Sequence, residues 1–384
     1  MRLRQGMNPH QGVGPVVPVE PGRWPVRVLN GEPSLINLLD ALNAWQLVSE
    51  AAAVAGRPAA ASFKHLSPAG AALAGALDPG TAALYGAGGA PGPVTGAYLR
   101  ARDADPKSSY GDLAAVSHEV DEELAELLQG LVCDGIVAPG YAPGAVARLA
   151  RKKGGRFLVL AADPGYRPPP TETREVFGLR LTQQRDAAPV GPELLDPVTG
   201  ERPGPAGLAD VLLGLTVLRY TQSNSVCYLR DGVTLGIGAG QQSRVDCTRL
   251  AGAKTDTWWL RRHPAVRAMA FRPGVRRQER VNWRVRCVEG DLTPDEQDRL
   301  AAVLTGPVPV LTAADRTAWL AGLDGVTFAS DGALPFRDNV DHAHRHGVAR
   351  IVEPGGSIRS GEVADACREH GITLLHTGLR LFHH

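Results

Sequence analysis

Apolar and polar positions along the first half of the chain predict helices that alternate with short buried strands. Residues 35–53 form a helical pattern with Ser34 as its N-cap, and residues 59–63 follow as a short apolar strand. The remaining elements predicted here are a helix over 121–131 and strands over 135–140 and 156–162. Residues 164–204 are polar and rich in proline, a composition typical of a connector.

The second half shows the same alternation. A helix is predicted over 208–220, followed by a hairpin of strands 225–229 and 233–237 that turns at Arg230-Asp231-Gly232. Further helices are predicted over 245–251, 295–304, 313–323, 337–346 and 360–370, and strands over 325–329, 348–352 and 373–376. The pattern predicts an α/β fold with a largely parallel sheet covered on both faces, in two units over residues 1–185 and 186–384.

Composition narrows the function classes. A formal net charge of +1 gives no general electrostatic reason to expect nucleic acid or an anionic membrane as partner. No apolar run is long enough to span a bilayer, and the N-terminus lacks the apolar core of a signal peptide. The five cysteines are scattered and form no Cys-x-x-Cys pair, which favours reduced thiols in a cytoplasmic protein.

The tripeptide Phe63-Lys64-His65 carries the clearest chemical signal. Only 5 of the 41 basic residues are lysines, and this one adjoins a histidine at the end of a predicted apolar strand. An amine and an imidazole together can transfer protons, which arginine cannot do. The alternative is a surface lysine beside a hydrogen-bonded core histidine.

Other polar segments allow two interpretations each. Residues 220–225 and 236–244 are dense in amides, hydroxyls and glycine, and suit either an anion or carboxamide site or simply tight turns before a helix. The loop at 330–339 is either a binding loop or a solvated helix cap. His342, His344 and His346 lie two apart, so on a helix they do not converge on one metal ion.

Taken in order, these motifs resemble one family. They are Leu3–Gln11, Val28–Gly31, Ser62–Gly70, Asp134–Gly140, Tyr220–Ser225, Gly236–Arg244, Leu334–Asn339 and Leu379–His384. Together they resemble the transformylase domain of the bifunctional purine-pathway enzyme that formylates 5-aminoimidazole-4-carboxamide ribonucleotide (AICAR). The resemblance implies two cytidine-deaminase-like three-layer α/β/α subdomains, with active sites formed across a homodimer.

In that family the IMP cyclohydrolase domain precedes this region, so the chain is expected to be a stand-alone transformylase that depends on a separate cyclohydrolase. The expected reaction moves the formyl group of 10-formyltetrahydrofolate to the 5-amino group of AICAR. His65 is implied as the base that deprotonates the amine, Lys64 as the group that stabilises the oxyanion or protonates the leaving nitrogen, and Asn224 as the group that holds the formyl group. The zinc-deaminase signature is absent, so deamination is not expected.

The resemblance also implies binding residues. Arg4 and Arg380 match the arginines on the nucleotide phosphate, and Arg244 matches one at the carboxamide. The other positions implied at the nucleotide are Gln5, Asn30, Gly140, Asp163 and Ala333. The positions implied near the folate are Asp338 and Asn339. A structural potassium site is implied at Thr221, Ser223, Ser225 and Asp331.

Three positions depart from the family pattern. Gln5 stands where a tyrosine is usual, Ala333-Leu334 replaces a Phe-Phe pair, and Asp246 stands where animal members have histidine. The first two remove aromatic surface from the predicted nucleotide pocket. Two further hypotheses therefore stay open: a formyltransferase that acts on an AICAR-like nucleotide in specialised metabolism, and a non-catalytic nucleotide-binding protein with the same fold.

Overall fold

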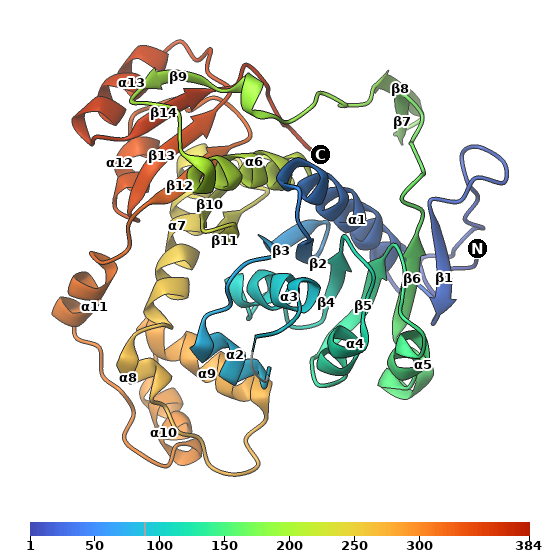
Figure 1. Cartoon of the computed structure of the whole chain (residues 1–384), viewed down its shortest axis with the longest axis horizontal. Helices are drawn as coiled ribbons and strands as arrows, with labels where there is room; N and C mark the ends of the chain where they lie inside the picture. Colours follow the sequence, from blue (N-terminus) through green and yellow to red (C-terminus); the bar gives the residue numbers. More distant parts are fainter. Residues whose placement is uncertain (88–89) are drawn as a thin grey trace.

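The computed structural model describes residues 1–87 and 90–384. One mixed sheet of twelve strands runs through the molecule in the order β1-β6-β5-β4-β2-β3-β11-β10-β12-β13-β14-β9 (Figure 1). Its first six strands are β1 (Val26–Asn30), β2 (Ala59–Lys64), β3 (Ser67–Leu73), β4 (Asp112–Val116), β5 (Cys133–Ala138) and β6 (Leu158–Ala162). The others are β9 (Asp196–Thr199), β10 (Val226–Arg230), β11 (Val233–Gly238), β12 (Val326–Ser330), β13 (Val348–Glu353) and β14 (Thr373–His376).

The two halves of the sheet repeat one topology. The first reads β1-α1-β2-β3-α3-β4-α4-β5-α5-β6, and the second reads β9-α6-β10-β11-α7-β12-α12-β13-α13-β14, apart from helices added in each half. The repeated helices are α1 (Leu35–Ala55), α3 (Pro93–Ala104), α4 (Glu122–Gln129), α5 (Ala145–Ala150), α6 (Pro205–Arg219), α7 (Arg244–Leu260), α12 (Asp338–His344) and α13 (Ser360–Glu369). The α/β prediction is confirmed; the boundary at residue 185 and the cytidine-deaminase likeness stay predictions.

The expectation of a largely parallel sheet is wrong. Parallel pairing is confined to β4-β5-β6 and to β12-β13-β14, and every other neighbouring pair in the sheet is antiparallel. Two of the antiparallel pairs follow from the local chain, since β2–β3 and β10–β11 are joined by two-residue turns, which only antiparallel strands can use. The other antiparallel pairs join strands that lie far apart in the chain. The halves meet at the antiparallel pairing of β3 with β11, called the seam below.

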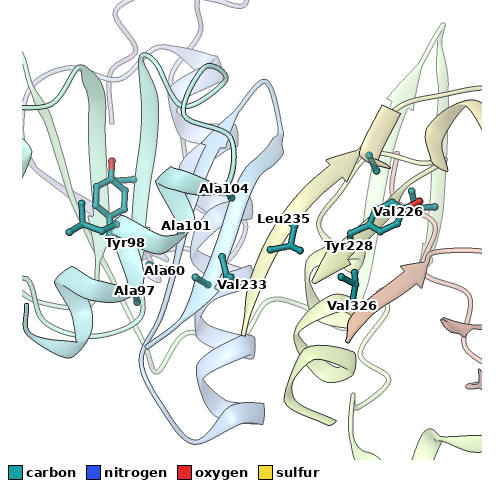
Figure 2. Close-up of a cluster of buried hydrophobic side chains, with 14 of the residues drawn as sticks. Ala60, Ala97, Tyr98, Ala101, Ala104, Val226, Tyr228, Val233, Leu235 and Val326 are labelled. Atoms are coloured by element: carbon teal, nitrogen blue, oxygen red, sulfur yellow. The ribbon is translucent and has the colours of Figure 1, made fainter. Parts of the chain in front are cut away.

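Helices cover both faces of the sheet. The apolar cluster on one face is built with α1 and α6, and the cluster on the other with α3, α4, α5, α7, α12 and α13. Figure 2 shows the second cluster around the seam, where Tyr98 on α3 and Tyr228 on β10 come from opposite halves. A Cβ at Gly236 or Gly238 would lie 2.2 or 2.6 Å from the backbone of α7, so these glycines serve close helix packing.

Some elements differ from the predictions. The stretch 164–204 contains an exposed hairpin, β7 (Thr171–Val176) with β8 (Leu179–Gln184), and also β9, which pairs with β14 in the main sheet. Helix α3 and strand β4 were not predicted; α3 is buried on nearly all sides and shows no polar stripe. Four helices lie between α7 and β12 and share a small core with α7: α8 (Pro264–Arg267), α9 (Arg277–Glu289), α10 (Pro294–Val303) and α11 (Ala313–Leu320). In the first half, the short helix α2 (Pro79–Tyr85) precedes α3.

Candidate active site

Lys64 and His65 lie at the tip of the β2–β3 hairpin. Lys64 ends β2, and its Nζ donates to the backbone oxygen of Tyr110 at 2.8 Å. His65 and Leu66 form the turn with φ values of 54° and 63°, a left-handed conformation that non-glycine residues rarely adopt. The His65 side chain is exposed, whereas Phe63 just before it is fully buried. The hairpin therefore presents an imidazole to solvent from a rigid base.

Asp40 on α1 holds this turn in place. Its Oδ1 accepts the Leu66 backbone N–H at 2.7 Å, and the carboxyl is almost fully buried. Burial raises the pKa of Asp40, while the Leu66 N–H and the nearby His65 oppose that shift. A buried carboxylate thus fixes the backbone of the proposed base.

Asn224 belongs to a second cluster, which joins the start of β10 to the start of α7 and the end of β12. Its Oδ1 accepts from Arg244 Nη2 at 2.7 Å, and its Nδ2 donates to the backbone oxygens of Gln241 and Gln242 at 2.9 and 3.0 Å. Arg244 also pairs with buried Asp331 at 2.5 Å. A Cβ at Gly332 would lie 2.5 Å from Arg244 Nη2, so the guanidinium requires glycine there.

The two clusters lie at one edge of the sheet. The backbone N–H of Gln222 contacts Ser67 Oγ at 3.4 Å, which links the Asn224 loop to the first residue of β3. The register agrees, because Phe63 pairs with Leu113 near the amino end of β4, and Val226 pairs with Ser330 at the carboxyl end of β12. We call this the His65 edge: the carboxyl ends of β2, β12, β13 and β14 with the amino ends of β4, β5 and β6.

Four residues implied at the nucleotide also lie at the His65 edge. Arg4 and Gln5 are held by backbone hydrogen bonds to Pro33 and Leu35 beside the start of α1. Arg380 follows β14, is exposed, and stacks on Phe382 with 4.6 Å from its guanidinium carbon to the ring centre. The fourth, Asn30, ends β1 and donates to the backbone oxygens of residues 155 and 157 at 3.1 and 2.7 Å, so its amide is engaged within the chain.

Gly140 and Asp163 lie at the opposite edge. They follow the carboxyl ends of β5 and β6, whose amino ends form the His65 edge. The strands between the two edges are five to six residues long, which is about 17–20 Å. One chain therefore does not bring these two positions together with His65.

The positions implied near the folate differ in access. Asp338 is half-buried at the start of α12, but the Asn339 side chain is fully buried and bonded to Thr248 and Asp338. The half-buried Ala333 precedes Leu334, whose backbone N–H donates to Glu353 at 2.8 Å. Burial raises the pKa of Glu353, which also lies 3.0 Å from His376.

The residues implied for potassium converge only in part. Ser223 and Ser225 both donate to Asp331 Oδ2, at 2.5 and 3.0 Å, whereas the Thr221 hydroxyl donates to the backbone oxygen of Val217. The other oxygen of Asp331 is paired with Arg244, so its charge is already balanced. The potassium site implied at these residues therefore stays a prediction.

Sequence reasoning missed Asp40 and Glu353, the carboxylates that hold the two loops of this edge. An acidic residue within an otherwise apolar helix or strand was the available signal. The three histidines of α12 and the turn after it have separate contacts: His342 with Arg249, His344 with His370, and His346 with Asp256. Across the described part of the chain, no helix is both long and apolar enough to cross a membrane.

Comparison with known proteins gives a consistent result. Residues 1–254 match the AICARFT/IMPCHase bienzyme family. The bifunctional purine biosynthesis protein PurH of Roseobacter denitrificans is 31% identical over 387 residues, which cover all of this chain and 59% of that protein. The PurH proteins of Sinorhizobium fredii and Brucella ovis are each 32% identical over 385 residues, which cover all of this chain and 58% of each relative. The chain thus spans less than two thirds of the length of these relatives.

Proposed function

The chain belongs to the AICARFT/IMPCHase bienzyme family, and from that membership we propose that it is a folate-dependent formyltransferase. The proposed reaction transfers the formyl group of 10-formyltetrahydrofolate to the 5-amino group of AICAR. The products are 5-formamidoimidazole-4-carboxamide ribonucleotide (FAICAR) and tetrahydrofolate. Ring closure to IMP is assigned to a separate cyclohydrolase activity.

One observation carries the proposal: the Lys64–His65 turn and the Asn224–Arg244 cluster share the His65 edge and are linked through Ser67 and Gln222. A proton acceptor, a cation and a polar amide thereby lie near one another on an accessible surface. Acyl transfer to an amine needs these three groups, for deprotonation, charge stabilisation and positioning. A protein that only binds a nucleotide has no need of the proton-transfer pair.

In the proposed mechanism the 5-amino nitrogen attacks the formyl carbon and gives a tetrahedral intermediate. His65 takes the proton that the amine loses. The Lys64 ammonium stabilises the oxyanion or protonates N10 as it leaves, after its Nζ exchanges the Tyr110 carbonyl for the substrate. Asn224 orients the formyl group, and Arg244 fixes the Asn224 amide through its contact with Oδ1. No covalent enzyme intermediate and no catalytic metal are required.

Substrate binding is proposed to use both edges of the sheet from two copies of the chain. Arg4 and Arg380 would hold the phosphate with planar guanidinium groups at the His65 edge. The location of Gly140 and Asp163 at the opposite edge supports a site completed by the second copy of a homodimer. Light scattering tests this directly, because full activity in a strict monomer contradicts a shared site.

The side chains of Gln5 and Ala333 support an alternative acceptor in place of AICAR, an AICAR-like nucleotide with a different heterocycle. Both positions lie at the His65 edge, and both carry small or non-aromatic side chains. Aromatic side chains commonly stack on bases, so their absence changes the surface offered to the ring.

The decisive experiment follows release of tetrahydrofolate from 10-formyltetrahydrofolate with purified protein and AICAR. We expect turnover, with accumulation of FAICAR and no IMP. His65→Ala is expected to lower turnover by about 100-fold or more while AICAR still binds. A folded, dimeric protein without turnover on AICAR would shift the proposal to the AICAR-like acceptor. AICAR binding with no turnover on either acceptor would identify a binding protein.

A further inference from the structure

A second, strongly basic cavity lies away from the candidate site. It has a volume of about 610 Å³ and is bounded by α2, the residues after α7, and the segment α8–α9. Figure 1 shows these helices grouped at one end of the molecule. No residue that lines the cavity belongs to the candidate active site. Six of its lining residues are arginines: Arg261, Arg262, Arg267, Arg277, Arg280 and Arg284.

Three of these arginines pair with carboxylates within the protein. Asp103, buried at the end of α3, pairs with Arg261 at 2.9 Å and with Arg262 at 2.8 Å. Arg267 pairs with Asp78 at 2.6 Å. Two carboxylates therefore balance three guanidinium groups, and this part of the cavity wall already carries one surplus positive charge.

The other three arginines add to that surplus. Within residues 1–87 and 90–384, no carboxylate oxygen lies within 4.0 Å of the guanidinium nitrogens of Arg277, Arg280 or Arg284. Burial lowers the pKa of Arg284, and the charges of Arg280 and Arg261 lower it further. Arginine nevertheless remains charged at neutral pH. The cavity thus gathers about four uncompensated positive charges, which an anion would relieve.

The guanidinium groups are held in place but keep unused donors. Arg280 donates through Nε to the backbone oxygen of Val275 at 2.8 Å, and Arg284 donates to the backbone oxygens of Val266 and Met269 at 3.3 and 3.1 Å. Arg261 is only 7% exposed, yet its Nε–H has no hydrogen-bond partner in the described structure. Arg280 and Arg284, by contrast, are only half-buried, so the donor N–H groups that their backbone contacts leave free can reach a ligand in the cavity.

We propose that this cavity binds an oligophosphate, a small anion with two or more linked phosphate groups. Its volume lies in the range of ligand pockets, about 300–1,000 Å³, and exceeds what one phosphate ion fills. Planar guanidinium groups match phosphate oxygens in pairs. An acidic peptide is the less suitable partner, because successive side chains of an extended chain point to opposite sides, so that carboxylates on one side are about 7 Å apart. Linked phosphates concentrate three or four charges in one compact group.

Calorimetric titration of the full chain with inorganic pyrophosphate, in phosphate-free buffer, tests the proposal. We expect one site per chain. The double variant Arg280→Gln/Arg284→Gln is expected to weaken binding at least tenfold, and Arg299→Gln to change it less than twofold. Arg299 is the matched control because it is exposed on α10 and lies outside the cavity. Arg380→Ala should keep pyrophosphate binding, which separates this cavity from the proposed nucleotide site.

Other probes identify the source and set the limits. ATP that binds as tightly as pyrophosphate supports a nucleotide as the carrier of the phosphates, and pyrophosphate alone supports an inorganic ligand. The proposal is overturned if the double variant, shown by circular dichroism to be folded, binds pyrophosphate as tightly as the unmodified protein. It is also overturned if orthophosphate matches pyrophosphate, or if triglutamate binds more tightly than either.

Discussion

The two halves of the sheet contain matching hairpins that differ in the residues of their turns. Asp40 is the sixth residue of α1, and its carboxylate accepts the N–H of Leu66 in the β2–β3 turn at 2.7 Å. Asp210 is the sixth residue of α6, and its carboxylate accepts the N–H of Gly232 in the β10–β11 turn at 2.6 Å. Both carboxyls are buried beneath their turns. The fold therefore uses one device twice.

The backbone of the two turns is also alike. The first has φ values of 54° and 63° at His65 and Leu66, and the second has 56° and 71° at Asp231 and Gly232. The second turn uses glycine where a left-handed conformation is required, whereas the first uses leucine at a cost of about 1–2 kcal/mol. Strain of this kind gathers at functional sites. The comparison thus supports the proposal that the Lys64–His65 hairpin, and not its counterpart, takes part in the reaction.

The sharpest test removes the exposed side chain at the matching position of each turn and compares the activity of the two variants. His65→Ala is expected to lower kcat by about 100- to 10,000-fold, the usual contribution of a general base. Asp231→Ala removes the matching exposed side chain from the other turn and is expected to leave kcat within twofold. Steady-state formyl transfer measures both. Equal losses in the two variants would show that the halves do not differ in function.

The second test concerns the pH dependence of stability. Burial raises the pKa of Asp210 to about 6, from 3.8 for an ordinary aspartate, so the folded chain holds this proton more tightly than the unfolded chain. The contribution of Asp210 to the free energy of unfolding should therefore fall by about 3 kcal/mol as pH rises from about 3 to about 7, and stay constant above.

Asp210→Asn is the variant that isolates this contribution, because the amide has no proton to lose in that range. Urea unfolding at pH 4, 5, 6 and 7 should show that the variant gains stability relative to the unmodified protein as pH rises. Parallel profiles for the two proteins would contradict a raised pKa at Asp210.

Asp40 offers a smaller, more selective effect. Asp40→Asn keeps an oxygen that can accept the Leu66 N–H but removes the negative charge beside His65. Because burial disfavours that charge, we expect no loss of thermal stability, while kcat falls about tenfold, equivalent to about 1.4 kcal/mol. If the melting temperature falls and KM changes while kcat stays the same, Asp40 has only a structural role.

The smallest expected effect is on the backbone of the second turn. Gly232→Ala places a Cβ in the left-handed region, 3.2 Å from Arg57 Nη2, and is expected to cost about 1 kcal/mol of unfolding free energy. Chemical denaturation measures it, and formyl transfer should not change. A stability gain in this variant would remove the argument from strain at Leu66.

Much of this fold could be predicted from the sequence, and the reasons are local. The hairpin that turns at Asp231-Gly232 and the helix capped by Ser34 are confirmed, since each depends on residues adjacent in the chain. The strand predicted over 59–63 is confirmed for the same reason, and it includes Lys64 as well. Strand direction was predicted incorrectly, because pairing depends on partners far apart in the chain.

The site shows the same division. The roles proposed for Lys64 and His65 follow from their residue types, but their proximity to Asn224 depends on the joining of the halves at β3 and β11. The carboxylate under the turn could not be assigned a role until the structure showed which N–H it accepts. Asn339 shows the opposite case. It is a polar residue near the proposed site, but its side chain is fully buried and hydrogen-bonded within the protein.

The seam between the halves has a kinetic consequence. Beside the single backbone pairing of Val233 with Ala72, the Thr234 hydroxyl accepts the Ala71 N–H at 3.0 Å and donates to the Ala71 carbonyl at 3.2 Å. A side chain thus takes the place of a backbone rung at the joint. Amide hydrogen exchange at Ala71 reports how often this side-chain rung opens, while the apolar clusters that span the seam on both faces of the sheet hold the two halves together.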